Sequence, residues 1–345
     1  MGYDVVTFGE AMLRLSPPAY KRIEQATSFD AVVGGAEFNV AVAVSRLGLK
    51  AAWISKLPDH QVGWLIRNRA REHGIDVTNV IWDKSSRARA GIYFMEFGAA
   101  PRSSSVLYDR WHSTISTLKP GEIDWKSVFD GTKLFHTSGI TPALAPKVAE
   151  ATEEALKAAK EMGVKVSYDL NYRGKLWTPQ EANQFTEKIS KYIDILITTE
   201  EDTKVVYGIE GTKQDDAFTK VEDETYAQVA KTLSDKYNFE AVAITLRENP
   251  SVLRNTWSAI VYHDGKVYTD RRYDIEVIDR IGGGDSFSAG LIYGYLTMDD
   301  VQKGLEFGNA FSALKHSIPG DLNYITLEEV EKLIKGTGRG LRISR

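Results

Sequence analysis

Three consecutive glycines followed by an aspartate stand out in DRIGGGDSFSAG, residues 279–290. Glycine has no Cβ, so the backbone N–H groups of Gly282, Gly283 and Gly284 can approach a ligand closely. The helix-like segment that follows adds unpaired N–H donors and partial positive charge, which favour an anion. Asp285 would repel that anion, unless its carboxylate accepts a proton from the attacking hydroxyl in a phosphoryl transfer.

This stretch matches neither of two common nucleotide-binding patterns. A Gly-x-x-x-x-Gly-Lys-Ser/Thr loop is absent, and Phe287 occupies the third glycine position of Gly-x-Gly-x-x-Gly. A simpler interpretation therefore stays open from these residues alone: a flexible glycine turn with Asp285 as the helix N-cap.

Composition restricts the class of protein. The 345 residues suffice for one large α/β domain or two ordinary ones, and 43% hydrophobic and 26% charged residues are typical of soluble globular proteins. The net charge of -4 predicts no general attraction to nucleic acid or anionic membrane, so small anions are favoured as ligands. The absence of cysteine excludes disulfides, thiolate metal ligands and a cysteine nucleophile, and the six histidines lack His-Glu-x-x-His spacing.

The N-terminal MGYDVVTFGEAML lacks the positive charge of a secretory signal, and no later apolar run reaches transmembrane length. We therefore expect a cytoplasmic protein.

Short apolar runs rich in β-branched residues alternate with helix-period segments along most of the chain. Residues 145–163 place apolar side chains on one stripe and end at a glycine, which predicts an amphipathic helix. This alternation predicts a doubly wound, mostly parallel sheet, with ligands beyond the carboxyl ends of the strands. The predicted strands are residues 4–9, 51–55, 133–139, 164–170, 194–199 and 240–246.

Two segments, about 13–33 and 87–112, interrupt the alternation and are predicted to be extra antiparallel strands. Neither is long enough to build its own core, so we interpret both as a discontinuous lid on one domain, residues 1–335. Residues 336–345 form a basic, glycine-rich tail that we expect to be loosely ordered.

Two stretches resemble the signature sequences of the ribokinase-like (PfkB-type) carbohydrate kinases: VVGGAEFNVAVAVSRLGLKAAWISKLPDHQVG near the N-terminus and DRIGGGDSFSAGLIYGYL. The likeness extends from the first predicted strand to about Asp321. It implies a ribokinase-like three-layer α/β/α sandwich with a small β-sheet lid, in agreement with the elements above. It further implies that Asp285 is the catalytic base, that Gly282 to Gly284 form the anion hole, and that ATP and Mg²⁺ are the cofactors.

Further stretches are similar to the family members that phosphorylate 2-keto-3-deoxygluconate to its 6-phosphate: GIYFMEFG, VLYDRW, DLNYRGKLW and ALKHSIPGDLNY. A sugar acid carries a carboxylate, and arginine offers a planar bidentate partner for it, which makes Arg110 and Arg173 the candidates. The similarity implies substrate contacts from Gly34, Gly35, Asn39, Tyr93, Tyr108, Arg110, Arg173 and Asp321.

These candidates have structural alternatives. Arg173 lies in a motif that fructokinase-like relatives share, so it could contact ATP phosphates, and Arg110 could be a solvated residue of an edge strand. The two tyrosines alternate within strand patterns and could belong to the core. Asn39 could cap or pack an early helical turn, and Asp321 could be a turn residue.

For the nucleotide, the resemblance implies contacts near the adenosine or the phosphates. The glycine that relatives carry after the strand ending near Thr245 is displaced here by the longer RENPSVLRNTW. The implied contacts are Asn171, Arg173, Thr245, Arg247, Gly282, Gly284 and Asn309.

The metal position departs from the family pattern. Many relatives carry Asn-x-x-Glu where this chain has Thr199 and Asp202, and that motif organises Mg²⁺ through water. Asp202 keeps a carboxylate and is the candidate for a water-mediated Mg²⁺ contact. Glu200 and Glu201 could be first-turn helix charges, and Ile281 replaces a frequent threonine.

The resemblance thus implies an ATP-dependent kinase that converts 2-keto-3-deoxygluconate to 2-keto-3-deoxy-6-phosphogluconate. A fructokinase or another keto- or deoxy-sugar kinase is the nearest alternative, and a non-catalytic sugar-sensing protein is an alternative of another class. We expect a sugar acid and ATP as partners, no nucleic acid, no membrane, and possible self-association through the lid edges.

Overall fold

A sheet of nine strands forms the centre of the molecule in the computed structural model, which describes residues 2–211 and 223–336. All six strand predictions are confirmed, and these six strands pair in parallel. The other three pair antiparallel at one side. In spatial order the strands are β4 (Ala51–Ile54), β1 (Val5–Phe8), β9 (Leu134–Ser138), β10 (Lys165–Asp169), β11 (Ile195–Thr199), β12 (Ala241–Ser251), β13 (Arg254–His263) and β14 (Lys266–Thr269), with β15 (Tyr273–Glu276) also on β13.

Helices cover both faces of this sheet, because successive strand residues point to opposite sides and both sides are apolar. Val6 packs into one buried cluster with the helices of one layer, and its neighbour Val5 packs into a second cluster with those of the other. The first layer contains α3 (Trp125–Phe129), α5 (Pro146–Glu161), α6 (Pro179–Ile189) and α8 (Asp223–Tyr237). The second contains α1 (Ala36–Arg46), α9 (Gly283–Thr297), α10 (Val301–Lys315) and α11 (Leu327–Ile334). The three-layer α/β/α sandwich is therefore confirmed.

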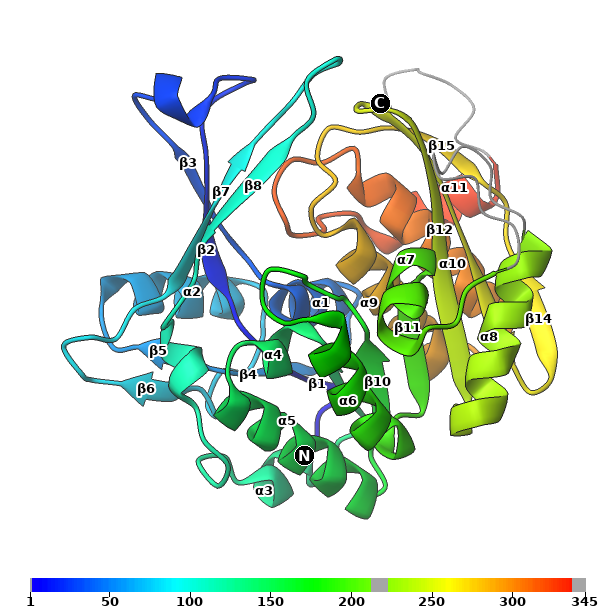
Figure 1. Cartoon of the computed structure of the whole chain (residues 1–345), viewed down its shortest axis with the longest axis horizontal. Helices are drawn as coiled ribbons and strands as arrows, with labels where there is room; N and C mark the ends of the chain where they lie inside the picture. Colours follow the sequence, from blue (N-terminus) through cyan, green and yellow to red (C-terminus); the bar gives the residue numbers. More distant parts are fainter. Residues whose placement is uncertain (1, 212–222, 337–345) are drawn as a thin grey trace.

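The small sheet is also confirmed, with one correction. It projects from one end of the sandwich, as Figure 1 shows. Its order is β3 (Asp30–Gly34), β2 (Met12–Ser16), β7 (Gly91–Glu96) and β8 (Ser105–Asp109). The pairs β2–β3 and β7–β8 are antiparallel, as expected, but β2 and β7 run parallel. They can do so because the long chain segment between them, which includes α1 and β4, allows a crossover.

Shorter elements complete the described chain. The segment RENPSVLRNTW, where the family glycine is displaced, forms the end of a long β12–β13 hairpin. The remaining elements are β5 (Lys56–Pro58), β6 (Ile81–Asp83), α2 (Gln61–Glu72), α4 (Ile140–Ala143), α7 (Glu200–Asp202), the 3₁₀ helices η1 (Ile23–Gln25), η2 (Thr114–Thr117) and η3 (Ser190–Tyr192), and the π-helix η4 (Thr203–Tyr207).

No helix within residues 2–211 or 223–336 is both long and apolar enough to span a membrane. Apart from Gly336, the predicted basic tail lies outside the described residues.

Candidate active site

A cavity of about 530 Å³ lies where the carboxyl ends of the parallel strands meet the small sheet. The strand ends contribute Asp169, Thr199 and Thr245, and the small sheet contributes Tyr93 and Tyr108. This is the edge at which doubly wound sheets bind their ligands, because loops from neighbouring strands converge there.

The glycine run borders this cavity, and its geometry refines the predicted anion hole. Gly282 is the N-cap of α9 in the left-handed region (φ 81°), and a Cβ there would lie 2.0 Å from the carbonyl oxygen of Asp321. Asp285 lies in the first turn and is not the N-cap. Gly282 and Gly284 line the cavity, whereas Gly283 packs against the ring of His316, where a Cβ would approach to 2.6 Å.

The free N–H groups differ from the predicted set. The Gly283 N–H donates to the carbonyl of Arg280 at 3.2 Å. Within the described residues, no acceptor is found for the N–H groups of Gly282, Gly284 and Asp285. The donors available to an anion are therefore these three, and sequence reasoning missed the amide of Asp285 itself.

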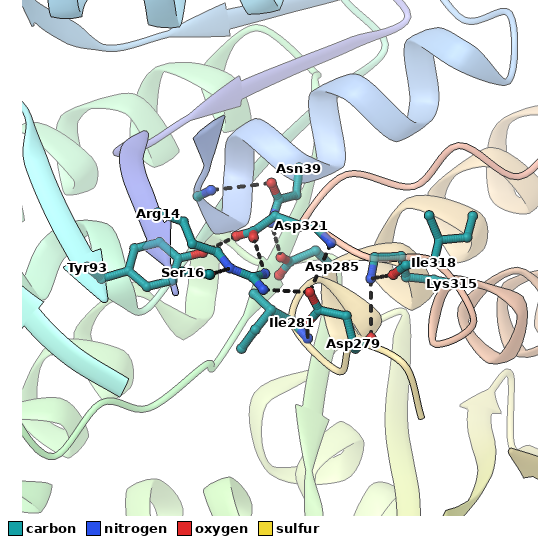
Figure 2. A network of polar contacts seen from close by, with 12 residues as sticks. Arg14, Ser16, Asn39, Tyr93, Asp279, Ile281, Asp285, Lys315, Ile318 and Asp321 are labelled. Carbon is teal, nitrogen blue, oxygen red and sulfur yellow. Dashed lines mark hydrogen bonds and ion pairs between the residues drawn. The ribbon is translucent and has the colours of Figure 1, made fainter. Parts of the chain in front are cut away.

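The carboxylate of Asp285 faces the same cavity from α9. Removal from bulk water raises its pKa to about 7, and the nearby carboxylates of Asp321 and Glu37 act in the same direction. The Nδ2 of Asn39 donates to Asp285 Oδ2 at 2.6 Å, and Arg173 adds positive charge, so both oppose the rise. Figure 2 shows Asn39 pointing from α1 toward this carboxylate. A carboxyl group with a pKa near neutrality is suited to accept a proton.

The predicted sugar contacts gather on the side of the cavity nearest the small sheet. Tyr93 is 4% exposed, donates its hydroxyl hydrogen to Asp321, and lies beside Tyr108 with ring centroids 5.8 Å apart. Gly35 lines the cavity, whereas Gly34 lies behind Asp321, since a Cβ there would be 1.9 Å from Asp321 Oδ2. Asp321 lines the cavity, and each of its carboxylate oxygens accepts from a protein group, Oδ1 from Arg14 and Oδ2 from Tyr93.

Arg110 is buried, so its interpretation as a solvated edge-strand residue is wrong. Its Nε donates to Glu10 Oε2 at 2.9 Å, and its Nη2 also pairs with that carboxylate. Ser113 Oγ donates to the other oxygen of Glu10 at 2.5 Å. Glu10 was not a sequence candidate, although it follows the end of β1 at the ligand-binding edge. It holds the guanidinium of Arg110 in place at the cavity wall.

A second group of arginines lies toward the β12 side of the cavity. Arg173, Arg247 and Arg280 all line it, and none forms an ion pair with a carboxylate among residues 2–211 and 223–336. Arg280 lies two residues before Gly282, separated from the glycine run by Ile281, and was not a sequence candidate. Thr245 and Asn171 line the same region. Guanidinium groups that have no carboxylate partner in the described residues, beside amides that have no acceptor there, form an environment for phosphate oxygens.

Asn309 lies outside the cavity lining and is fully buried in α10. Its Nδ2 donates to Asp270 Oδ2 at 2.7 Å and to the carbonyl of Arg271 at 3.0 Å. The structure therefore gives it a role in holding the loop after β14.

The acidic residues near Asp202 fit an indirect metal contact. Asp202 and Asp169 line the cavity, and burial raises the pKa of Asp202 to about 6. No cluster of three or more His, Asp or Glu suited to direct metal binding occurs in the described chain. Carboxylates that reach Mg²⁺ through its retained waters need no such cluster, so these residues fit the ion. Glu200 is in the first helical turn, as proposed, but is buried and does not line the cavity.

A network of charged side chains beside the cavity was also not predicted from the sequence. Arg14 from β2 pairs with Asp279 at 2.7 Å and with Asp321 at 2.8 Å, and Lys315 donates to the carbonyl of Asp279 at 3.3 Å (Figure 2). The sequence signal that could have indicated this network is Arg14 itself, a charged residue at a position of an alternating strand pattern that shares its side with Met12. The structure shows that this side of β2 is buried.

A carboxylate beside amides that have no acceptor in the described residues is chemically suited to the transfer of an anionic group to a hydroxyl, and comparison with known proteins identifies a family with that activity. The model described as pfkB family carbohydrate kinase matches residues 3–324. The chain therefore belongs to the pfkB family of carbohydrate kinases, and is a phosphotransferase that uses an alcohol group as acceptor.

Individual relatives span the whole chain. A 2-dehydro-3-deoxygalactonokinase of Haloferax volcanii is 39% identical over 341 residues, which is 99% of each chain. The crystal structure of a 2-dehydro-3-deoxygluconokinase from Thermotoga maritima has a TM-score of 0.92 and 46% identity, covering 96% of this chain and 99% of that one. A putative ribokinase II of E. coli, in complex with ATP and Mg²⁺, shares the fold at a TM-score of 0.79 and 18% identity, covering 97% and 99%.

We expect Asn39→Ala to raise the pKa of Asp285 above about 7, because the carboxylate loses its donor from Nδ2. Carboxyl ¹³C NMR titration measures this shift, with Asp285→Asn to assign the signal. Ser45→Ala is the control, since Ser45 lies on the same helix and bonds the carbonyl of His73 instead. An unchanged or lower pKa in Asn39→Ala would contradict the role of this amide.

Proposed function

We propose that this protein is an ATP- and Mg²⁺-dependent kinase that phosphorylates 2-keto-3-deoxygluconate, also called 2-dehydro-3-deoxygluconate, on its 6-hydroxyl. The observation that carries the proposal is the position of Asp285, a carboxyl with a pKa of about 7 beside three N–H groups that have no acceptor among the residues the structure describes. This combination supplies both a base for a sugar hydroxyl and a cradle for a phosphoryl group.

In this mechanism Asp285 would accept the proton of the sugar hydroxyl as that oxygen bonds to the terminal phosphorus of ATP, while the bond from this phosphorus to the bridging oxygen breaks and ADP leaves. The N–H groups of Gly282, Gly284 and Asp285 bind the phosphoryl oxygens, and Arg173, Arg247 and Arg280 lie where the remaining phosphates would extend. Oriented dipoles in a site that excludes water stabilise charge by several kcal/mol. Mg²⁺, with Asp169 and Asp202 as its water-mediated partners, would neutralise phosphate charge when bound.

The position of Arg110, on the side of the cavity nearest the small sheet, favours a sugar acid as the substrate. Arg110 is oriented by Glu10, and a substrate carboxylate could share its guanidinium with the fixed carboxylate. The relatives named for 2-dehydro-3-deoxygluconate and 2-dehydro-3-deoxygalactonate support the same substrate class. These two sugar acids differ in the configuration of one carbon, so the galactonate epimer is the nearest competing substrate. Fructose and other neutral sugars are a weaker alternative.

We further propose that residues 1–335 act as one cytoplasmic kinase domain in which the small sheet serves as a lid. Closure over the sugar would exclude water and so limit wasteful ATP hydrolysis. Strands β3 and β8 are the edges of this sheet, and the exposed Leu107 and Trp111 near β8 support self-association there.

A panel of sugars in a coupled ADP-release assay tests this function. We expect the fastest turnover with 2-keto-3-deoxygluconate and slower turnover with its galactonate epimer and with fructose. Preference for a neutral sugar would overturn the substrate class. No sugar-dependent ADP release, together with sugar binding, would favour the sugar-sensing alternative.

Asp285→Asn should preserve the fold and lower kcat by about 10²- to 10⁴-fold, because only the charged carboxylate can accept the proton. In the unmodified protein, kcat/KM should rise with pH through about 7, since the base works in its deprotonated form. Steady-state kinetics from pH 5.5 to about 8.5, with circular dichroism as the folding control, measure both effects. Retention of most activity by Asp285→Asn would show that another group is the base.

The role of Arg110 is best tested as a pair, because replacing it alone leaves Glu10 buried without its cation. Charge-assisted hydrogen bonds contribute about 1.5–3 kcal/mol, so Glu10→Gln/Arg110→Gln should raise KM for the sugar acid about 10- to 100-fold. Glu10→Gln alone is the control for packing. An equal effect of both variants, or an equal loss with a neutral sugar, would exclude Arg110 as the carboxylate partner.

A further inference from the structure

Arg14 forms an ion pair between the small sheet and Asp279, in the loop that carries the anion hole. It lies on β2, is 3% exposed, and its two terminal nitrogens bond different carboxylates, Asp279 at 2.7 Å and Asp321 at 2.8 Å. Its Nε donates to Ser16 Oγ at 3.0 Å, so every nitrogen of the guanidinium has a partner. Figure 2 shows the guanidinium between the two aspartates.

Both aspartates lie against the start of α9, Asp279 through its carboxylate and Asp321 through its backbone carbonyl. Asp279 Oδ1 accepts the N–H of Ile281 at 3.0 Å, and its Oδ2 accepts the N–H of Gly320 at 2.9 Å. The carbonyl of Asp321 lies against Gly282, where no Cβ would fit. The two loops that Arg14 joins therefore enclose the residue that opens the anion hole.

The small sheet contacts this point through two neighbouring strands. Arg14 on β2 and Tyr93 on β7 are register partners, and both bond the carboxylate of Asp321. A shift of the small sheet would thus move Arg14 and Tyr93 at the same time, and both bond Asp321. Because Arg14 also bonds Asp279, the position of Asp279 would change as well.

The charged groups of this network are buried, so their charges have to be balanced within the protein. An isolated buried charge is strongly unfavourable. Here the positive charges of Arg14 and Lys315 balance the negative charges of Asp279 and Asp321. A guanidinium presents donors in a fixed planar fork that can bond two carboxylates at once, whereas a lysine ammonium on a flexible stem is a point charge. Arginine is therefore specifically suited to this position.

We propose that Arg14 is a positioning residue that couples the small sheet to the anion hole, so that the N–H groups of residues 282–285 are aligned when the sheet is seated. The contribution of Arg14 to turnover rests on the proposed kinase function. Its contribution to the order of the loop does not.

The test compares Arg14→Lys with the unmodified full-length protein. Arg14→Lys keeps the charge, and we expect faster hydrogen exchange confined to the peptides covering 279–286 and 319–322. With ATP and 2-keto-3-deoxygluconate, kcat should fall about 10- to 100-fold, as expected for a misaligned site, while KM for ATP stays within about twofold. Arg102→Lys is the matched control, since Arg102 pairs with Glu96 within the small sheet and does not line the cavity. It should change neither readout.

A double-mutant cycle with Asp279→Asn shows whether Arg14 acts through this partner. We expect the double variant to lose less kcat than the product of the fold-losses of Arg14→Lys and Asp279→Asn, because each single substitution already breaks the same contact. Unchanged exchange at 279–286, an increase spread over the whole chain, or fully multiplicative losses would overturn the coupling. Absence of kinase activity in the unmodified protein would instead refute the proposed function, and the exchange result would still decide whether Arg14 orders the loop.

Discussion

The desolvation of one carboxylate at the start of a helix is the constraint on which the candidate site depends. Asp285 lies next to amides that have no acceptor in the described chain, and its pKa is raised to about 7 because water is excluded from it. In water the same carboxyl would be a weaker base and the same amides would be hydrated. The surrounding structure therefore has to exclude water from the carboxylate and from the amides, and has to hold them in a fixed orientation to each other.

The fold meets that requirement by converging loops from distant parts of the chain. The carboxyl ends of β10, β11 and β12 supply polar groups on one side, and α1 supplies Asn39, which opposes the rise in the pKa of Asp285. The small sheet closes another side with Tyr93 and Tyr108. None of these elements is adjacent to α9 in the sequence: α1 packs directly against α9, β10, β11 and β12 belong to the nine-stranded sheet, and the small sheet is separate from it.

Arginines divide into two groups with different physical roles. Arg14 and Arg110 are buried and paired with carboxylates, so they position structure and present at most part of their charge to a ligand. Arg173, Arg247 and Arg280 face the cavity without a carboxylate partner in the described residues, so their charge is available to phosphate. Residue type is the same in both groups, and the difference arises from what the fold places opposite each guanidinium.

Local patterns in the chain predicted a doubly wound, mostly parallel sheet, and the resemblance to the pfkB-type kinases implied the three-layer sandwich with its lid and the roles of the glycine run and Asp285. Alternating strand and helix periods predicted the six parallel strands and α5, since local sequence dictates the hydrophobic period. The glycine run with Asp285 was recognisable because its function depends on residues adjacent in sequence. The same local reasoning was wrong about the strand direction between β2 and β7, and it missed Glu10, Arg280 and the amide of Asp285.

Only the tertiary structure decided which groups are paired. Arg14 contacts partners 265 and 307 positions away, Arg110 contacts Glu10 across 100 positions, and Asn309 bonds a loop instead of facing the cavity. Propensity and periodicity report on neighbours along the chain, whereas ion pairing and desolvation depend on distance and burial in space. The chemistry available at this site is therefore encoded locally, but its strength is set by contacts that form only when the chain folds.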